Sequence, residues 1–405
     1  MNGTRDRLAV VLSEGTGGLG TVRALHKHQV PTVAIAFDRR ATVLASRLPK
    51  RKVFVEAGSP ERLEDGLLSA LRAVGGERPV LMPTSDRLVS FMHRNGAALA
   101  RDFDFCLPEA RLAERLNDKH EETRLIASLG IPLPKTVQEL PERWQDLEEA
   151  LGLPLIFKAR SYRHGDALGR KKNVVARTRE QLQRFYEDCG DRLGLVLAQE
   201  VIPGPDDSLW LCSGTFNRRH ELVEGLVKRK LRMSPPHFGV CSLAVSASNP
   251  EFLELVRRLG GLLHYTGHAS IEFKWDYRDG LYKYIEVNPR IPASVALDEA
   301  SGVPTVWATY RLALGEDLRP LATTRQRDGV VYVKRLEDIT NRLNDGERAA
   351  GILWHHLSLA LRRRVGAHFA WSDPKPGLAY AWWFALEKWA GLWRRLRIAR
   401  ESGAS

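Results

Sequence analysis

The sequence has few cysteines, four in 405 residues, and they are widely scattered. They stand at Cys106, Cys189, Cys212 and Cys241. No two of them have the short spacing of a zinc site, and the pattern of a disulfide framework is missing. Neither kind of site is expected, and a reducing cytoplasm is the compartment that fits this cysteine usage best.

Long hydrophobic runs are also missing. The chain begins with charged residues at positions 5–7 and shows no apolar segment of the kind that forms the core of a signal peptide. The longest apolar run, residues 378–386, is far too short to span a bilayer. We therefore expect a cytoplasmic protein without a transmembrane helix.

A third absence concerns nucleophilic catalysis. No Ser-His-Asp or Cys-His arrangement stands out, and the twelve histidines are scattered. We expect surface positions or satisfied interior positions for His26, His28, His355 and His356. A catalytic triad is therefore not expected.

Positive charge is in excess, with 61 Lys and Arg against 49 Asp and Glu. Much of the excess lies at the end of the chain, because residues 355–405 hold nine Lys or Arg and three acids. Such a segment suits either an acidic surface as neighbour or simple solubility. No nucleic-acid partner is expected.

The stretch from Ile271 to Arg290 organises the middle of the chain. Two apolar segments flank a turn at Asp279-Gly280, which predicts a pair of antiparallel strands. Glu286 and Asn288 are two residues apart, so their side chains leave the same face of the second strand. Glu272 on the first strand can face them across the ladder.

Two carboxylates and an amide oxygen on one sheet face suit a hard cation such as magnesium. Magnesium usually borrows further oxygens from a bound nucleotide, which indicates phosphoryl transfer. The alternative is a solvated hairpin with charged residues on its outer side. The metal interpretation is favoured because Glu286 lies in the apolar run 284–288, which can be partly buried, and Pro289 then ends the strand.

The N-terminal region carries a dinucleotide-binding pattern. A predicted strand at residues 8–12 is followed by the glycine-rich loop Gly15–Gly20 and a helix through His28, and a second strand, 33–37, ends at Asp38. The pattern fixes only a close backbone approach at a helix N-terminus, which can hold any anion, including a substrate carboxylate.

A further strand, residues 80–82, ends in the polar segment 83–86 and places polar groups at the carboxyl edge of the same sheet. We therefore predict that residues 1–113 form one open α/β domain with a parallel sheet. At 405 residues, the chain is long enough for two or three domains.

Two basic segments follow. Residues 155–160 form a predicted strand with Lys158 in apolar surroundings, and a basic loop, residues 161–172, leads to a partner strand at 174–176. Such a loop can cover phosphate groups, or it can be a plain solvated turn. The second segment, residues 226–232, is strongly basic. Its alternative interpretation is an exposed edge strand protected by lysines.

Taken in order, the polar residues of the middle of the chain resemble those of ATP-grasp enzymes. The residues that carry the resemblance are Lys119, Lys158, Glu200, Glu272, Glu286, Asn288 and Arg290. The similarity is to the carboxylate–amine ligase branch, which includes D-aspartate ligase, biotin carboxylase and the carbamoyl-phosphate synthase large chain. It is clearest over residues 116–302, is weaker in the N-terminal domain, and covers nothing beyond about residue 320.

The resemblance implies a fold in three parts. Residues 1–113 would be the pre-ATP-grasp domain, and residues 114–320 a two-lobed α+β ATP-grasp domain. Residues 321–405 would be a helical, basic region that the family does not share.

The resemblance also implies roles for the matching residues. Lys158 and Lys119 would neutralise the α- and β-phosphate oxygens of ATP. Asp207, or equally Asp206, would take the ribose hydroxyls. The adenine would be cradled by the backbone of Gln199, Glu200, Val201 and Ile202.

At the other end of the nucleotide, Glu272, Glu286 and Asn288 would hold magnesium, for which manganese can substitute. Arg290 would clamp the substrate carboxylate or the transferring phosphoryl group. Further phosphate or substrate contacts are expected from Arg229, Lys230 and Arg232.

The implied reaction joins a small carboxylate to a small amine. A carboxylate is a poor electrophile because its leaving group would be oxide, whereas transfer of the γ-phosphoryl group makes an acyl phosphate that an amine can attack. Two alternatives stay open: an NAD-dependent oxidoreductase using the Gly15–Gly20 loop and Asp38, and a non-catalytic nucleotide-binding, membrane-associated protein. The ligase is favoured because the ordered set of polar residues is more specific than one glycine loop.

The C-terminal region contains a predicted amphipathic helix, residues 378–400. One helical stripe is formed by Leu378, Trp382, Leu386, Trp389, Trp393 and Leu396. Its C-terminal end is crowded by Arg394, Arg395, Arg397 and Arg400. The helix either contacts the inner surface of the membrane or packs on the catalytic body or a second subunit, and packing is favoured because aromatic stripes are usually core. A homodimer also stays open.

Overall fold

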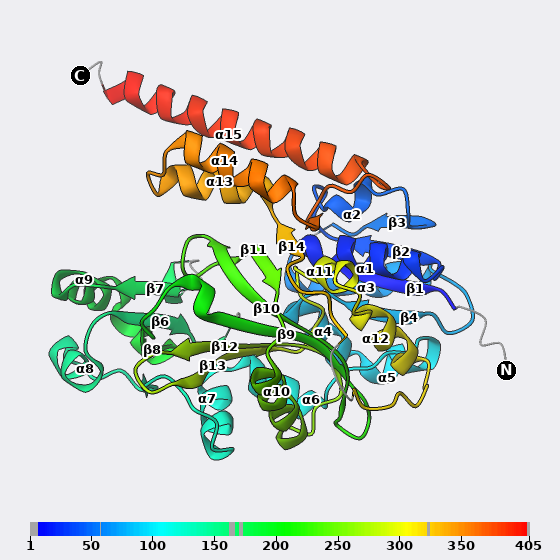
Figure 1. Ribbon diagram of the computed structural model, residues 1–405, viewed down its shortest axis with the longest axis horizontal. Helices are drawn as coiled ribbons and strands as arrows, with labels where there is room; N and C mark the ends of the chain where they lie inside the picture. The colour runs from blue at the N-terminus through cyan, green and yellow to red at the C-terminus, as the bar shows by residue number, and fades with distance from the viewer. Residues whose placement is uncertain (1–6, 57, 162–166, 170–172, 322–324, 403–405) are drawn as a thin grey trace.

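The computed structural model describes residues 7–56, 58–161, 167–169, 173–321 and 325–402, with side chains described up to residue 389. The chain forms an N-terminal α/β domain, a small antiparallel lobe, a large central sheet and a group of C-terminal helices (Figure 1). The predicted mixed α/β architecture is confirmed.

The N-terminal domain is built on a parallel sheet of order β3-β2-β1-β4. Its strands are β1 (Ala9–Ser13), β2 (Thr32–Ala36), β3 (Arg51–Phe54) and β4 (Val80–Pro83). Its helices are α1 (Gly15–Lys27), α2 (Thr42–Ala45), α3 (Pro60–Arg72), α4 (Asp86–Arg94) and α5 (Gly96–Asp102). Alternate residues of β1 enter two different cores, so both faces of the sheet are covered and the strands are continuous apolar runs.

The glycine-rich segment does not form the loop that the sequence predicts. Helix α1 already begins at Gly15, so Gly18 and Gly20 are buried in its first two turns. A Cβ at Gly18 would overlap Ser13 Oγ, and one at Gly20 would lie 2.7 Å from Val295 Cγ1. These glycines therefore permit close packing of α1. The same glycine pattern would also allow a phosphate to approach the backbone, so the sequence alone does not tell the two roles apart.

The small lobe is an antiparallel sheet of order β5-β8-β6-β7. It is reached through the helices α6 (Ala110–Asn117) and α7 (Lys119–Ser128). Its strands are β5 (Thr136–Val137), β6 (Leu155–Ala159), β7 (Asn173–Ala176) and β8 (Val196–Glu200), and its helices are α8 (Trp144–Leu151), α9 (Arg179–Cys189) and the 3-10 helix η2 (Gly190–Leu195). Most of the basic loop at 161–172 lies outside the described residues, so its suggested role as a phosphate cover stays a prediction.

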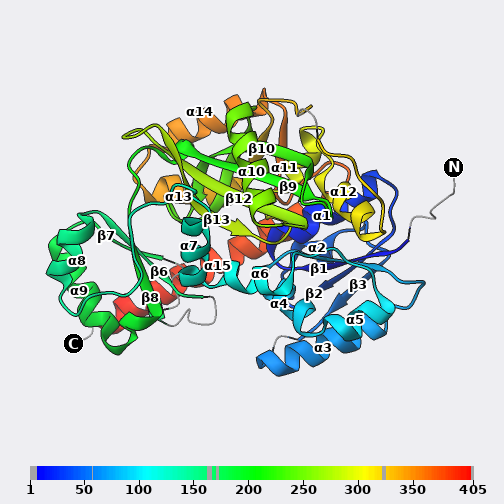
Figure 2. The ribbon, with the colours of Figure 1, turned by 90° about the horizontal axis from the view of Figure 1, so that it is seen from below.

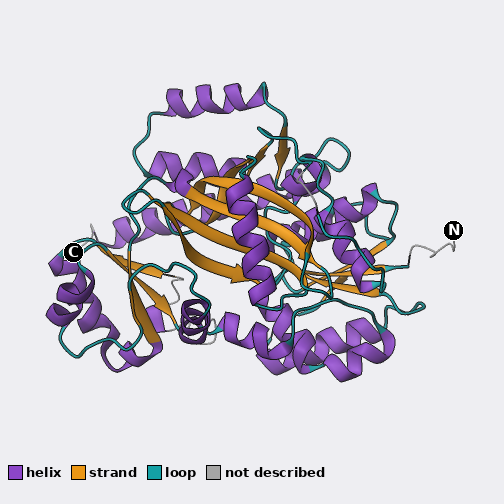
Figure 3. Cartoon of the chain, turned by 60° about the horizontal axis from the view of Figure 1, so that its bottom comes forward, coloured by secondary structure: helices purple, strands orange, loops and turns teal. Residues whose placement is uncertain are grey.

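The central sheet has the order β13-β12-β9-β10-β11-β14-β15, and only β14 and β15 are parallel neighbours (Figure 3). Its strands are β9 (Leu209–Phe216), β10 (Leu222–Ser234), β11 (Val240–Ser246), β12 (Gly267–Asp276), β13 (Leu281–Asn288), β14 (Val331–Val333) and β15 (Arg364–Gly366). The 3-10 helix η3 (Asp206–Ser208) precedes β9, and the associated helices are α10 (Pro250–Leu262), α11 (Ala296–Ala300) and α12 (Thr305–Ala313). The predicted hairpin is confirmed as β12 and β13, with the turn at Asp279-Gly280.

The basic segment 226–232 lies in the middle of this sheet. It belongs to β10, which pairs with β9 on one side and β11 on the other, so the edge-strand interpretation is wrong. Lys228 Nζ donates to Asp298 Oδ1 at 2.9 Å, and both side chains are almost completely buried. Lysines in this strand therefore act inside the protein, as partners of carboxylates.

The C-terminal region contributes more than helices, because β14 and β15 extend the central sheet. Its helices are α13 (Arg335–Asn344), α14 (Ala349–Ala360) and α15 (Lys375–Ser402), which lie together on one side of the molecule (Figure 1). Helix α15 begins beside α2 and runs towards the side of the small lobe, while α14 lies at the edge of the molecule (Figure 2). Among the helices described, none combines the length and the hydrophobicity that crossing a bilayer requires.

The described part of the tryptophan stripe of α15 is largely exposed. Leu378, Trp382 and Trp389 are 63%, 64% and 64% exposed, and Leu386 is 45% exposed. The expectation that the stripe packs on the catalytic body is therefore wrong for these four residues. The side chains of its remaining members and of the terminal arginines lie outside the described part.

Candidate active site

A cavity of about 310 Å³ lies between the small lobe and the central sheet. Its walls come from β6 and the end of β8 on one side and from β10, β12 and β13 on the other, and Asp86 reaches it from the N-terminal domain. Among the residues predicted for the site, those that line this inter-lobe cavity are Lys119, Lys158, Gln199, Glu200, Val201, Ile202, Lys230, Glu272, Glu286, Asn288 and Arg290. A volume of this size suits a small organic ligand.

One wall of the inter-lobe cavity carries the predicted oxygen ligands. Glu272 of β12 and Glu286 of β13 are direct partners in the antiparallel register, so both side chains leave the same face. Asn288 lies two residues further along that face and donates from Nδ2 to Glu286 Oε1 at 3.0 Å. The expected grouping of the three residues on one sheet face is confirmed.

Two cations accompany these oxygens. Lys230 Nζ lies 2.5 Å from Glu272 Oε2, and Arg290 Nη2 donates to Asn288 Oδ1 at 3.1 Å. Burial by itself lowers the pKa of Lys230, but the carboxylates of Glu272 and Glu286 outweigh that effect and raise it. The ammonium of Lys230 is therefore kept charged inside the protein.

The donor set fits a hard divalent cation that is only partly held by protein. Glu272, Glu286 and Asn288 offer carboxylate and amide oxygens, the ligand types that magnesium prefers. Among the described residues, no group of three or more His, Cys, Asp or Glu side chains is placed to hold a metal ion alone. The remaining ligands must then come from water or from a bound molecule, as is usual for magnesium at a nucleotide.

Lys119 and Lys158 approach the inter-lobe cavity from two directions. Lys119 opens α7, and its Nζ lies 2.6 Å from Oε2 of the buried Glu122, which also accepts from Tyr284 Oη at 2.5 Å. Burial lowers the pKa of Lys119, but Glu122 and Glu286 together raise it above its ordinary value. Lys158 lies on β6, which is paired on both sides, so its position is fixed by the sheet.

The end of β8 and the segment after it are held by the side chains of Arg278 and Lys274, which the sequence did not assign to this place. Glu200 accepts from Lys135 N at 3.0 Å and from Arg278 Nη1 at 2.8 Å. Burial raises the pKa of Glu200, but these two donors outweigh it and lower that pKa. Lys274 donates to Ile202 O at 2.8 Å and Gly204 O at 3.1 Å, so it fixes the same segment from β12.

The N-terminal domain supplies one acid to the inter-lobe cavity. Asp86 is the first residue of α4, and its Oδ1 lies 3.3 Å from Arg290 Nε. Both residues line the cavity, together with the metal-type ligands. The sequence had indicated polar groups at this edge of the parallel sheet, without linking them to Arg290.

Comparison with known proteins shows similarity in the part of the chain that carries this arrangement. The model for the carbamoyl-phosphate synthase L chain, ATP binding domain, matches residues 254–321, which include β12, β13 and the cavity residues on them. The carbamoyl phosphate synthase large chain of Methanothrix thermoacetophila is 25% identical over 305 residues, covering 70% of this chain and 26% of that protein. The D-aspartate ligase of Enterococcus faecium is 26% identical over 192 residues, covering 44% of this chain and 45% of that protein.

Solved structures show the same fold. The biotin carboxylase domain of the Hydrogenobacter thermophilus 2-oxoglutarate carboxylase, in complex with MgADP, ADP and bicarbonate, superposes with a TM-score of 0.60. It shares 17% identity, and the match covers 80% of this chain and 73% of that one. In sequence and fold the chain is thus similar to ATP-grasp ligases such as these. It spans less than half the length of the curated relatives it matches.

Four residues predicted for the site do not line the inter-lobe cavity: Asp206, Asp207, Arg229 and Arg232. Asp207 Oδ2 lies 2.7 Å from Arg229 Nη2, and Arg232 forms a bidentate pair with Asp338 of α13 at 2.6 and 2.8 Å. The suggested ribose and substrate contacts stay predictions for these residues. The alternative for the ribose, Asp206, accepts from His237 Nδ1 at 3.0 Å if that nitrogen carries the proton, and His237 lines the cavity.

The site residues that sequence reasoning missed are Glu122, Lys274 and Asp86. Lys274 had a usable signal, because it stands two residues from Glu272 on the same strand. Glu122 had a weaker one, since it follows Lys119 by one helical turn. Asp86 had only a general one, the polar segment 83–86 at the carboxyl edge of the sheet, because its neighbour Arg290 is more than two hundred residues away in the chain.

Proposed function

We propose that this protein is an ATP- and magnesium-dependent ligase that joins a small carboxylate to a small amine through an acyl phosphate. The observation that carries the proposal is the meeting of two kinds of group in the inter-lobe cavity. Lysines suited to phosphate oxygens, Lys119 and Lys158, enclose the same space as the oxygen ligands Glu272, Glu286 and Asn288.

The proposed chemistry needs charge neutralisation more than a nucleophilic side chain. A substrate carboxylate oxygen attacks the γ-phosphorus, the bond to the β-phosphate oxygen breaks, and ADP leaves. The amine nitrogen then attacks the acyl carbon, loses a proton, and expels phosphate. Arg290 stands where it can hold the carboxylate, and Lys230 stands beside the metal-type ligands, where a cation can stabilise the transferring phosphoryl group.

The metal would be held by Glu272, Glu286 and Asn288. When bound, magnesium would neutralise charge on the β- and γ-phosphates; manganese has the same oxygen preference. The biotin carboxylase domain cited above was crystallised with MgADP, which supports the same choice of cofactor here.

The dehydrogenase alternative loses support from the geometry of α1. Gly17, Gly18 and Gly20 of the fingerprint are buried in helix packing, and none of the fingerprint glycines lines the inter-lobe cavity. Asp38, the acid that would take the ribose of NAD, is exposed and accepts a hydrogen bond from Arg40 N. An oxidoreductase therefore has no assembled site in the described part of the chain.

The first test is ligand-dependent stability of the purified protein. Because a ligand stabilises only a protein that binds it, MgATP should raise the melting temperature and NAD should leave it unchanged. Omitting magnesium should reduce the shift. Stabilisation by NAD alone would contradict the proposal.

The second test identifies the reaction. Pools of small carboxylates should stimulate ADP release, and hydroxylamine, which captures acyl phosphates as hydroxamates, should replace the natural amine. A hydroxamate that forms only when ATP and one particular carboxylate pool are present shows that this pool contains the substrate acid. ADP release that no carboxylate pool changes would contradict the acyl-phosphate step.

Two finer expectations belong to this proposal. The substrates are expected to be small molecules of the cytoplasm. A homodimer is compatible with the biotin carboxylase domain cited above, which was described as a dimer. Light scattering on the purified full chain measures the oligomeric state directly.

A further inference from the structure

Helix α14 presents an apolar face that no other part of the described chain covers. Its sequence, residues 349–360, contains no charged residue. Leu353, Trp354 and Leu357 are 62%, 75% and 54% exposed, and Leu361, just after the helix, is 91% exposed. Their spacing of three or four residues places them along one side of the helix.

The opposite side of α14 is anchored. Ile352 and Leu359 are buried, and His356 Nε2 lies 3.1 Å from Oδ2 of the buried Asp338 on α13. Loose attachment of the helix is therefore not the reason why its apolar residues are exposed. The helix is fixed by one side and displays the other at the edge of the molecule (Figures 2 and 3).

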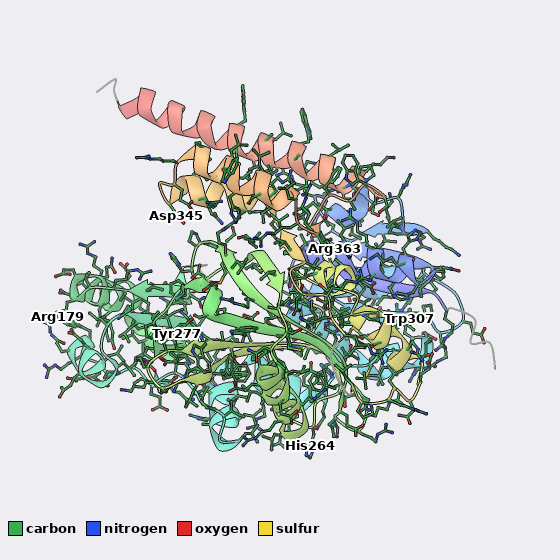
Figure 4. The ribbon with its side chains drawn as sticks, viewed as in Figure 1. Arg179, His264, Tyr277, Trp307, Asp345 and Arg363 are labelled. Atoms are coloured by element: carbon green, nitrogen blue, oxygen red, sulfur yellow. The ribbon has the colours of Figure 1, made fainter. Side chains whose placement is uncertain are left out.

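Arginines stand at both ends of the apolar face, and the exposed acids Asp345 and Glu347 come just before the first of them. Arg348 precedes the helix, Arg362 and Arg363 follow it, and all three are exposed. Figure 4 labels Asp345 and Arg363, which mark the two ends of the α14 region. From residue 348 to residue 372 the sequence contains no Asp or Glu, so the only formal charges there are positive.

We propose that this face, defined by Leu353, Trp354, Leu357 and Leu361 with the flanking arginines, docks on an anionic lipid bilayer surface. Leucine and tryptophan would enter the interface between headgroups and acyl chains, and the arginines would pair with lipid phosphates. A helix that lies flat needs no bilayer-spanning length.

The charges favour lipid over a second copy of the chain. In a two-fold contact of this face with itself, the positive ends of the two helices would meet no acidic residue within the face. An anionic bilayer supplies the negative charge that the face lacks. Helix α15 lies on the same side of the molecule as α14 (Figure 1), and its exposed Trp382 and Trp389 add apolar surface.

The experiment is co-sedimentation of the full chain with vesicles. One set is pure phosphatidylcholine, and the other contains a quarter phosphatidylglycerol. We expect at least tenfold more protein bound to the anionic vesicles, with binding weakened by salt. The double variants Leu353→Ser/Trp354→Ser and Arg362→Glu/Arg363→Glu should each reduce that binding at least tenfold.

A matched control changes the same residue types elsewhere. Leu262→Ser/Arg258→Glu lies on α10, on the opposite side of the molecule from α14 (Figure 1), and should bind like wild type. All the changed residues are exposed or at a surface, so circular dichroism melting should show every variant folded. In solution, the two α14 variants should keep wild-type ADP release, which separates this proposal from the proposed function.

Two results would overturn the lipid proposal. One is wild-type protein that ignores anionic vesicles, or variants that bind as well as wild type does. The other is a dimer, seen by light scattering, that Leu353→Ser/Trp354→Ser dissociates while the vesicles bind nothing. That second result would assign the face to a second copy of the chain.

Discussion

The inter-lobe cavity and helix α14 depart from the usual distribution of side chains in opposite directions. Around the cavity, charged residues such as Lys230 and Glu272 are buried, whereas on α14 Trp354 and Leu361 are exposed. Both arrangements are unfavourable unless something compensates them. In the cavity the compensation is internal, because each buried charge has a partner of opposite sign. On α14 the described chain provides no such cover.

This difference separates two kinds of mutational effect. Removing a cavity charge changes what the site can bind and leaves a partner behind, as with Lys230 beside Glu272. Removing an exposed leucine from α14 leaves the fold intact and changes only what the surface contacts. The predictions below test the cavity and the contacts that tie it to the rest of the molecule, from the largest expected effect to the smallest.

The largest effect is expected at the metal-type face. Glu286→Gln keeps the shape of the side chain and the contact with Asn288 but removes a negative charge that should hold magnesium. We expect ADP release to fall by about 100-fold or more, with an unchanged melting temperature in the absence of ligand. Steady-state kinetics at several magnesium concentrations measures the loss.

Glu254→Gln is the matched control, because Glu254 is an exposed acid of α10. It should show wild-type kinetics. Wild-type turnover in Glu286→Gln itself would remove Glu286 from the metal site.

The next effect concerns ATP binding. Lys158→Ala removes a cation from the wall of the inter-lobe cavity, and losing a charge-assisted phosphate contact should weaken ATP binding by about 2–3 kcal/mol. Isothermal titration with a slowly hydrolysed ATP analogue measures the dissociation constant. Arg177→Ala, an exposed cation just after β7, should leave it unchanged. An equal dissociation constant in Lys158→Ala would reduce Lys158 to a strand residue.

The contact between β10 and α13 should depend on pH. Burial raises the pKa of Asp338, but His356 and Arg232 outweigh it and lower that pKa to about 2. A carboxyl group with a lowered folded-state pKa stabilises the protein above its unfolded pKa of about 3.9, and that stability is lost as the pH falls from about 4 towards 2. The shift corresponds to about 2 kcal/mol.

Urea unfolding of wild type and Asp338→Asn checks this expectation. The two proteins should differ by about 2 kcal/mol at pH 7 and by clearly less at pH 3. Asp345→Asn, at an exposed position, should match wild type at both values. A difference that stayed constant with pH would show that the Asp338 carboxylate contributes by its shape and not by its charge.

The smallest effect is expected at the glycine-rich start of α1. A Cβ at Gly17 would lie 3.3 Å from Pro292 O and 3.3 Å from Thr84 Cβ, and Pro292 follows Arg290 by two residues. Gly17→Ala should therefore disturb the segment that carries Arg290, raising the KM for the carboxylate substrate several-fold and leaving ATP affinity within about twofold.

Gly96→Ala is a control, because a Cβ at Gly96 would meet no atom within 4 Å. Gly17→Val should act in the same direction as Gly17→Ala, and more strongly. A micromolar NAD affinity that is lost in both Gly17→Val and Asp38→Ala would contradict the ligase proposal and restore the dehydrogenase.

Sequence reasoning located the parts of the site that depend on local periodicity. Glu272, Glu286 and Asn288 could be placed on one face because strand side chains alternate and the hairpin turn sets the register. Lys158 could be found because a lysine in an apolar strand is unusual. The parallel N-terminal sheet followed from continuous apolar runs separated by helical segments.

Contacts between distant segments could not be found in the same way. Arg232 pairs with Asp338, which is 106 residues later, so no local pattern relates them. The glycines of α1 satisfied a sequence fingerprint. One of the atoms that leave no room for a side chain at Gly20 belongs to Val295, which lies more than 250 residues later in the chain. The exposure of Trp382 and Trp389 was missed because an aromatic stripe shows that a helix is amphipathic but does not show whether another part of the protein covers its apolar side.

Asp373 links the N-terminal domain to a segment that is synthesised much later. This fully buried carboxylate, just before α15, accepts from Arg23 Nε of α1 at 3.3 Å and from Ser46 Oγ at 2.8 Å, across 350 and 327 residues of chain. During synthesis, the N-terminal domain emerges from the ribosome long before this partner exists, and Arg23 must wait for it. The buried contacts of Arg23 in α1 are therefore completed only after a residue 350 positions further along the chain has been made.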